Sequence, residues 1–361
     1  MKKIFLTAAL IATLFTGCSN ELIDAGDFPD NPANPSIDFT PMDFGVSEAI
    51  TRGTQITKND ITEYGVSASI YPASNTFTTA GCGSYWFCDR IEAASGRSNH
   101  FWPGASYRVS FFAYAPYGNA ALTVRSKDDL GYPIYSYTVP TAIANQVDFM
   151  TAKVTDRLAS NTSSVSLSFE HRCSDIRFVV INNKAEDVTV NSISLYGVKY
   201  SGTYNGTSWS LNNTTNSKSQ YTFTLAANST ATHGESTDIT GTTNHFIILP
   251  QTISSGTEIF NFVIDSEEHP FSPDSNITFE EGKSYTFNVT IEDDEEIEIS
   301  LTATIKDWVV ETETDVIPAV NPTDTQTIIA NWVFTPSDED DSPTPQYPTS
   351  PNTGVNDWES E

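Results

Sequence analysis

The chain has 361 residues, of which 18 are basic and 46 are acidic, and its formal net charge is −28 at pH 7. Such an excess of negative charge repels phosphate-rich polymers, which argues against nucleic acid as a partner. The length is sufficient for two domains of ordinary size.

Residues 1–17 have the pattern of a signal peptide. Two lysines precede an apolar run over residues 4–15 that is too short to cross a bilayer as a helix. The run leads into Cys18 and resembles a bacterial lipoprotein signal, although Phe15 stands where leucine is usual. Under this interpretation Cys18 becomes the mature N-terminus and carries acyl chains that anchor the protein to a membrane. The alternative is an ordinary secretory peptide with an incidental cysteine.

The next part of the chain changes from a tether to a β-rich texture. Residues 18–36 place three prolines among acidic and amide side chains, which predicts a flexible tether. From residue 37 onward, short runs rich in Val, Ile, Thr, Phe and Tyr recur between turn-forming residues, and no window has a sustained helical period. One run alternates apolar and polar residues cleanly, with Tyr285, Phe287, Val289 and Ile291 on one face. We therefore expect an all-β protein built from antiparallel β-sandwiches.

The turn-rich stretch over residues 155–164 predicts a boundary between two domains, residues 37–159 and residues 160–316. Residues 317–335 are predicted as a linker followed by a further strand, in which alternate residues share an apolar face: Ile328, Ala330, Trp332 and Phe334. Residues 336–361 are acidic, rich in Pro, Ser and Thr, and lack Lys and Arg, which predicts a disordered tail.

We find no motif for catalysis or for metal binding. The five histidines lie far apart, and His171 follows Phe169 at strand spacing, which favours a satisfied, half-buried histidine over a metal ligand. The acidic run over residues 292–296 lacks the ligand order of a calcium loop and is better explained as a solvated turn. We therefore predict no metal, no cofactor and no enzymatic activity.

Two further groups of residues have more than one interpretation. Cys82 and Cys88 could close a short disulfide loop in an oxidising compartment, or they could pack as two reduced thiols. An aromatic group could form a stacking platform in a glycan-binding outer-membrane lipoprotein, or it could pack in a sandwich core. The group comprises Tyr85, Trp86, Phe87, Phe101 and Trp102. The core is favoured because Trp102 leads through Pro-Gly directly into a strand.

The order of short motifs along residues 37–308 carries a resemblance. The motifs include TRGT (51–54), YGVSASIY (64–71), HFWPGASYRVSFFAYAP (100–116), VSLSFEHRCSDIRFVV (165–180) and GKSYTFNVTI (282–291). Together they resemble the fimbrillin family, surface lipoproteins of Bacteroidales-type bacteria that polymerise into fimbriae or cap them. The resemblance implies two tandem transthyretin-like antiparallel β-sandwich domains, an outer-membrane lipid anchor, and strand exchange between subunits after proteolysis. It also implies other fimbrial subunits as partners and a role in adhesion to a host or bacterial receptor.

The residues themselves offer a site for such processing. No basic residue lies between Lys3 and Arg52, so Arg52 and Gly53 form the first bond that an Arg-specific protease would meet on the mature chain. An ordinary surface arginine is the alternative. Cleavage would remove Cys18 and the candidate strand over residues 36–44, and the open edge would recruit another strand. The candidate donor is the apolar face over residues 328–334, which an ordinary last strand of the second domain would also show. Whether the chain is a major, accessory or tip subunit stays open.

Overall fold

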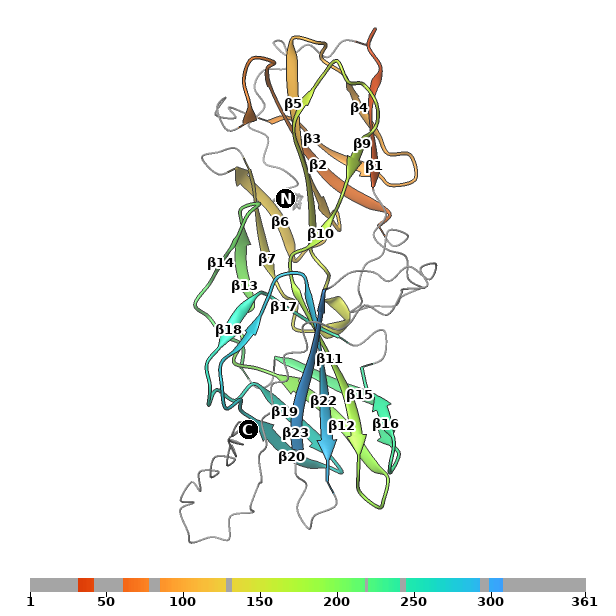
Figure 1. Ribbon diagram of the computed structural model, residues 1–361, viewed down its shortest axis with the longest axis vertical. Coiled ribbons are helices and arrows are strands. Elements are labelled where there is room, and N and C mark those ends of the chain that lie inside the picture. Colours follow the sequence, from red (N-terminus) through yellow and green to blue (C-terminus); the bar gives the residue numbers. More distant parts are fainter. Residues whose placement is uncertain are drawn as a thin grey trace, which may run out of the picture.

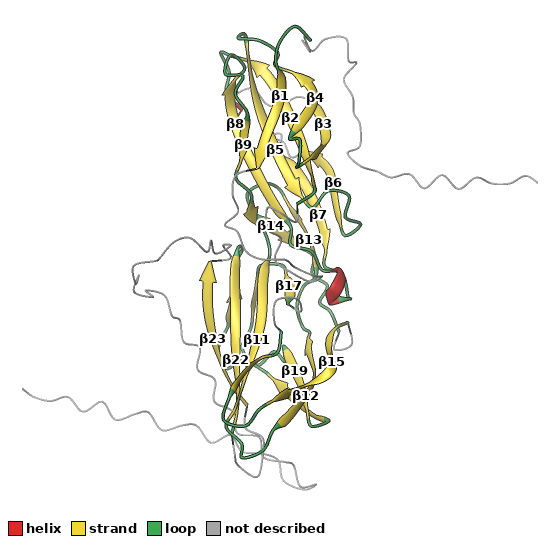
Figure 2. Ribbon diagram, turned by 90° about the vertical axis from the view of Figure 1, so that its right-hand side faces the viewer, coloured by secondary structure: helices red, strands yellow, loops and turns green. Residues whose placement is uncertain are grey.

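The computed structural model describes residues 32–41, 61–77, 85–127, 132–217, 220–240, 245–292 and 299–307. These residues form strands β1 to β23 and one 3-10 turn, η1 (Ile143–Asn145). The strands build an elongated body, with the N-terminal strands at one end and the C-terminal strands at the other (Figures 1 and 2). The predicted all-β sandwich architecture is confirmed.

Two sheets form the N-terminal sandwich. A three-stranded sheet has the order β4-β1-β9, and a five-stranded sheet has the order β10-β8-β5-β2-β3. The bounds are β1 (Ser36–Pro41), β2 (Glu63–Pro72), β3 (Tyr85–Glu92), β4 (Arg97–Phe101), β5 (Tyr107–Ala115), β8 (Met150–Leu158), β9 (Val165–Leu167) and β10 (Glu170–His171). Strand β5 lies in the middle of the larger sheet, so its alternate residues are covered on both faces. Phe111 enters the core between the two sheets, while Phe112 packs with Tyr71 and Phe77 on the outer face.

A four-stranded sheet lies between the two ends of the molecule (Figure 1). Its order is β14-β13-β7-β6, with β6 (Leu122–Lys127), β7 (Pro133–Thr138), β13 (Ser201–Tyr204) and β14 (Trp209–Leu211). Strands β7 and β13 pair antiparallel from Ser201 opposite Thr138 to Tyr204 opposite Tyr135. This sheet therefore combines strands from both sides of residue 159.

The C-terminal sandwich also consists of two sheets. One has the order β16-β11-β22-β23, with β17 also paired to β11, and the other has the order β15-β12-β19-β20. The short strands β18 and β21 pair separately. The bounds are β11 (Ser174–Asn182), β12 (Val188–Leu195), β15 (Tyr221–Ala231), β16 (Ser236–Asp238), β17 (Phe246–Ile248), β18 (Gln251–Ile253), β19 (Phe260–Ile264), β20 (Glu267–Phe271), β21 (Ile277–Phe279), β22 (Lys283–Ile291) and β23 (Ile299–Asp307).

Alternation in β22 positions its core face as the sequence predicts. Tyr285, Phe287, Val289 and Ile291 are buried, and the residues between them are half-buried. Phe178 of β11 lies at the centre of this core, with its ring 5.1 Å from that of Phe260 and 5.7 Å from that of Phe287. The prediction of alternating faces is confirmed for this strand.

The chain passes from one sandwich to the other between β10 and β11, which is later than residue 159. Strand β9 pairs with β1, and β10 pairs with β8, so both belong to the N-terminal sheets. Val165, Leu167 and Phe169 accordingly lie in the N-terminal core. The division into independent domains at residues 159 and 160 stays a prediction.

Candidate functional site

Strand β1 is held between two strands that come from distant parts of the sequence. It runs antiparallel to β4 and parallel to β9, with Phe39 opposite Val165 and Pro41 opposite Leu167. The backbone N–H of Phe39 donates to the carbonyl oxygen of Gly96 over 2.7 Å. Within the described chain, β1 continues into neither of these strands, because the next described residue after Pro41 is Ile61. We call the space that β1 fills between β4 and β9 the β1 slot.

The inward face of β1 is apolar and buried. Ile37 has 0% and Phe39 has 3% of its surface exposed, and Pro41 is buried as well. The ring of Phe39 meets the ring of Phe111 edge to face, with 5.2 Å between their centroids. Burying each such apolar side chain contributes roughly 1.5–3 kcal/mol, so Ile37 and Phe39 together contribute about 3–6 kcal/mol to the seating of β1.

The outward face of β1 makes polar contacts with the residues just before β9. The hydroxyl oxygens of Thr40 and Ser164 lie 2.6 Å apart. The Ser164 hydroxyl also lies 3.2 Å from the carbonyl oxygen of Asp38, to which it donates. These contacts fix the register of β1 along β9, because a slip by one residue would remove them and turn the apolar face outward.

Gly96 allows β1 to approach the turn before β4. Its φ is +64°, a conformation that glycine adopts readily. A Cβ atom at this position would lie 2.1 Å from the carbonyl oxygen of Phe39. Because that contact is with backbone, β1 itself would have to move to relieve it.

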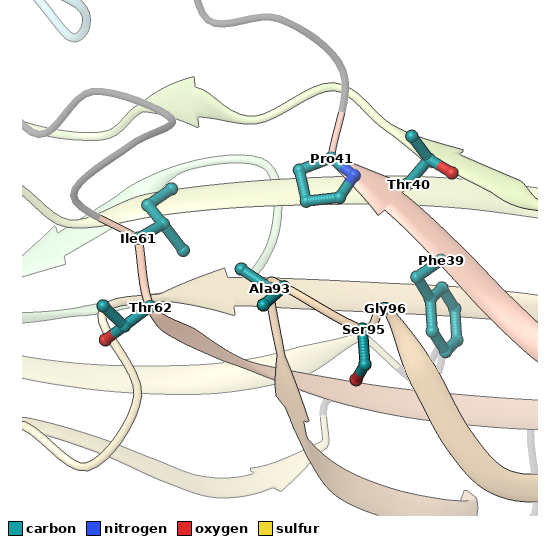
Figure 3. A pocket seen from close by; sticks show the side chains of 9 residues that line it. Phe39, Thr40, Pro41, Ile61, Thr62, Ala93, Ser95 and Gly96 are labelled. Atoms are coloured by element: carbon teal, nitrogen blue, oxygen red, sulfur yellow. The ribbon is translucent and has the colours of Figure 1, made fainter.

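A cavity of about 530 Å³ lies at the C-terminal end of β1. It is lined by Phe39, Thr40, Pro41, Ile61, Thr62 and residues 93–96, so both ends of the segment 42–60 meet at it (Figure 3). None of these lining residues has an ionisable side chain. The cavity is therefore suited to hold apolar chain and offers no acid, base or metal ligand.

Comparison with known proteins identifies the family. A sequence profile described as fimbrillin-like matches residues 48–308, which is most of the chain. The chain belongs to the fimbrillin-like family. Membership places it among surface-exposed fimbrial and adhesion-type subunits, which form a family of structural proteins and not of enzymes. The predicted resemblance is thereby confirmed.

Solved structures support the fold of this fimbrillin-like chain. A candidate cell adhesion protein from Bacteroides ovatus matches with a TM-score of 0.50 and 17% identity, over 77% of this chain and 99% of that one. A candidate cell adhesion protein from Bacteroides uniformis matches with 0.44 and 17% over 76% and 99%, respectively. A fimbrial assembly protein from Parabacteroides distasonis matches with 0.36 and 14% over 71% and 96%. No curated protein sequence matches the chain.

Exposed aromatic residues for glycan binding are not found where that hypothesis places them. Trp86, Phe87 and Trp102 of the fimbrillin-like chain are buried in the N-terminal core, and Phe101 is half-buried. Phe87 stacks on the ring of His100 at 4.2 Å between centroids. The stacking platform is therefore wrong for these residues, and the core interpretation is confirmed for them. The side chain of Tyr85 lies outside the described part.

The two most buried histidines pair with aspartates. His171 Nδ1 lies 2.7 Å from Asp148 Oδ2, and His245 Nδ1 lies 3.0 Å from Asp175 Oδ1. Burial alone would raise the pKa of Asp175, but the charges of His245 and Arg177 and their hydrogen bonds outweigh it and lower that pKa to about 2. Among the described residues, no group of three potential ligands is arranged to hold a metal ion.

Arg172 joins the two sandwiches where β10 ends. Its guanidinium donates to Thr151 of β8 over 2.7 Å and to Glu281 and Glu170 over 2.6 Å each. It also lies over the ring of Tyr204 in the middle sheet, at 5.1 Å from the centroid. One side chain thus contacts both sandwiches and the sheet between them.

Several predicted site residues lie outside the described part of the chain: Cys18, Arg52, Gly53, Cys82, Ile328, Ala330, Trp332 and Phe334. Cys88 is described, and its thiol lies 3.4 Å from the hydroxyl of Ser67, to which it donates. Acylation, cleavage, the disulfide and strand donation therefore stay predictions. No helix among the described residues is long and apolar enough to cross a membrane.

Gly96 and Ser164 were not found from the sequence. Gly96 follows Ser95, and a Ser-Gly pair is a turn signal that could have marked it. No local pattern distinguishes Ser164 from the other polar residues around it, because its partners lie more than 120 positions earlier in the chain.

Proposed function

We propose that this chain is a fimbrial subunit that is exported as a lipoprotein, held at the outer membrane by acylated Cys18, and cut between Arg52 and Gly53. The cut allows β1 to leave and a strand of a neighbouring subunit to replace it. Repetition of this step builds a fimbrium head to tail, and the assembled fimbrium acts in adhesion. The partners are other fimbrial subunits and a receptor on a host or bacterial surface.

The position of β1 is the observation that carries this proposal. It lies between β4 and β9, and the segment 42–60, which contains Arg52, is its connection to β2. A single cut in that segment would separate β1, together with the lipid on Cys18, from everything that follows. The departing strand would uncover the burial sites of Ile37 and Phe39 and leave unpaired backbone groups on β4 and β9. Such open rows of N–H and C=O groups favour the entry of another strand.

Charge and composition are consistent with a role outside the cell. The net charge of −28 keeps separate subunits soluble and disfavours their random association. A specific, buried strand is then a suitable means of joining them, because it brings apolar contacts and backbone hydrogen bonds at one defined place. The contact is heterologous, so it continues into a filament rather than closing into a dimer.

Mass spectrometry of the N-terminus tests the proposal. Protein from the cells that produce it should begin either at an acylated Cys18 or at Gly53, and Arg52→Ala should retain only the acylated form. Cys18→Ala should abolish incorporation of labelled palmitate. Incubation of the purified chain with an Arg-specific protease should give a ladder of polymers, which Arg52→Ala prevents. If the Arg52→Ala protein polymerises as well as the parent, cleavage at this bond is not the trigger.

A further inference from the structure

The sequence of β1 recurs near the C-terminus. Residues 36–41 read SIDFTP and residues 331–336 read NWVFTP, so the last three residues are identical. The first and third apolar residues also correspond, since Ile37 and Phe39 match Trp332 and Phe334 in spacing. In β1 it is this alternate set, with Pro41, that is buried. The recurrence therefore preserves the pattern that seats β1.

We propose that residues 331–336 of a second copy of the chain enter the β1 slot in the register and direction of β1, with Phe334 in the place of Phe39. This inference rests on the strand exchange proposed above and specifies which segment enters and how it lies. The incoming strand runs parallel to β9 and antiparallel to β4, as β1 does.

Three contacts of β1 are reproduced in this register. Phe334 supplies the ring that meets Phe111 and the N–H that the carbonyl oxygen of Gly96 accepts. Thr335 supplies the hydroxyl that pairs with Ser164, as Thr40 does at 2.6 Å. Pro336 ends the strand at the position of Pro41, where β1 itself has no N–H to donate.

Other registers lose these contacts. A shift that places Pro336 at the position of Phe39 removes the N–H that bonds to Gly96, because proline has none. The opposite shift by two places Val333 at the position of Thr40, where no hydroxyl remains for Ser164. A shift by one turns Val333 and Thr335 inward and the aromatic residues outward. Only the register set by Phe-Thr-Pro satisfies the slot.

The length of chain beyond β23 permits this exchange between molecules. Strand β23 ends at Asp307, and residues 308–330 separate it from the proposed donor. About 23 extended residues span up to roughly 75 Å, which is enough to reach a neighbouring molecule.

A graft in the full-length chain tests the fit without any cleavage. Because the register makes Phe-Thr-Pro common to both segments, the triple variant S36N/I37W/D38V converts β1 into the proposed donor sequence. The matched control places residues 329–334 (IANWVF) over positions 36–41, which is the same donor shifted by two. We expect the register-matched graft to melt within about 6 °C of the parent, the allowance being for the larger Trp at position 37, and the shifted control to melt lower by at least about twice that amount. Equal losses in the two grafts would overturn the inference.

Cysteine cross-linking tests the register in the polymer. Thr40 lies opposite Ser166, so Thr335→Cys with Ser166→Cys should form a disulfide between protease-treated subunits, and Val333→Cys with Ser166→Cys should not. A bond from position 333 would refute the register, and a bond within one chain would refute the second copy as donor. If the matched graft folds and no polymer forms, the segment fits the slot while the proposed polymerisation is wrong. A polymer whose matched graft fails would leave polymerisation intact and refute this donor.

Discussion

Replacing Gly96 by alanine should loosen β1 without touching its sequence. The added Cβ would lie 2.1 Å from the carbonyl oxygen of Phe39, and non-bonded contacts of this kind are not found below 3.0 Å. The strand must therefore shift by roughly 1 Å, since backbone cannot rotate out of the way as a flexible side chain does. Such a shift lengthens the 2.7 Å hydrogen bond from Phe39 to Gly96 beyond a useful distance.

The expected loss of stability can be separated into two parts. A non-glycine residue at a φ of +64° costs about 1 kcal/mol wherever it occurs. Displacing β1 adds about 1 kcal/mol for the hydrogen bond and a share of the roughly 3–6 kcal/mol from burying Ile37 and Phe39. Gly118 has a similar φ of +71° and nothing within 4 Å of the added Cβ, so Gly118→Ala measures the first part alone.

Thermal unfolding and hydrogen exchange would measure the difference. We expect Gly96→Ala to be less stable than Gly118→Ala by at least about 2 kcal/mol, which corresponds to roughly 4–8 °C in melting temperature. The amide of Phe39 should lose its protection from exchange in Gly96→Ala and keep it in Gly118→Ala. Equal melting temperatures for the two variants would refute the close approach of β1 to this turn.

Three further predictions concern buried groups. The carboxylate of Asp175, with its pKa lowered to about 2, should contribute about 2 kcal/mol of stability at neutral pH, and this contribution should disappear as the pH falls from about 4 to 2; Asp175→Asn, followed by denaturant unfolding across that range, should lack this step. Arg172→Ala should destabilise the chain by about 3 kcal/mol because it leaves the part-buried Glu281 unpaired, and Arg172→Lys, which keeps the charge but not the fork, should recover only part of the loss in the same assay. Trp102→Ala should cost about 3–5 kcal/mol in denaturant unfolding because the side chain is fully buried, and native gels containing polysaccharide should show no glycan retardation for the parent to lose.

Local pattern was sufficient for the strands and their faces. The alternation from Tyr285 to Ile291 fixes which side of β22 enters the core, since neighbouring side chains of a strand must point in opposite directions. The order of short motifs was likewise sufficient for the family. Both signals are contained within short stretches of sequence.

Pairings between distant segments could not be obtained in this way. The parallel contact of β1 with β9 and the antiparallel contact of β7 with β13 join residues that no local pattern relates. The pair of Asp175 and His245 has the same character, because only the folded chain brings the two residues to 3.0 Å. The Phe-Thr-Pro recurrence is visible in the sequence, but it gains meaning only when burial shows which residues of β1 face inward.

The middle sheet has a mechanical consequence for a filament under load. Because β7 and β13 belong to the two halves of the chain and are zipped together from Ser201 to Tyr204, tension applied along the body is carried by rungs between strands instead of by a slack connector. Pulling the halves apart would require those rungs to rupture while the tyrosines beneath them become wet. A subunit built in this way resists stretching as a strut does, which suits a thread that must hold against flow.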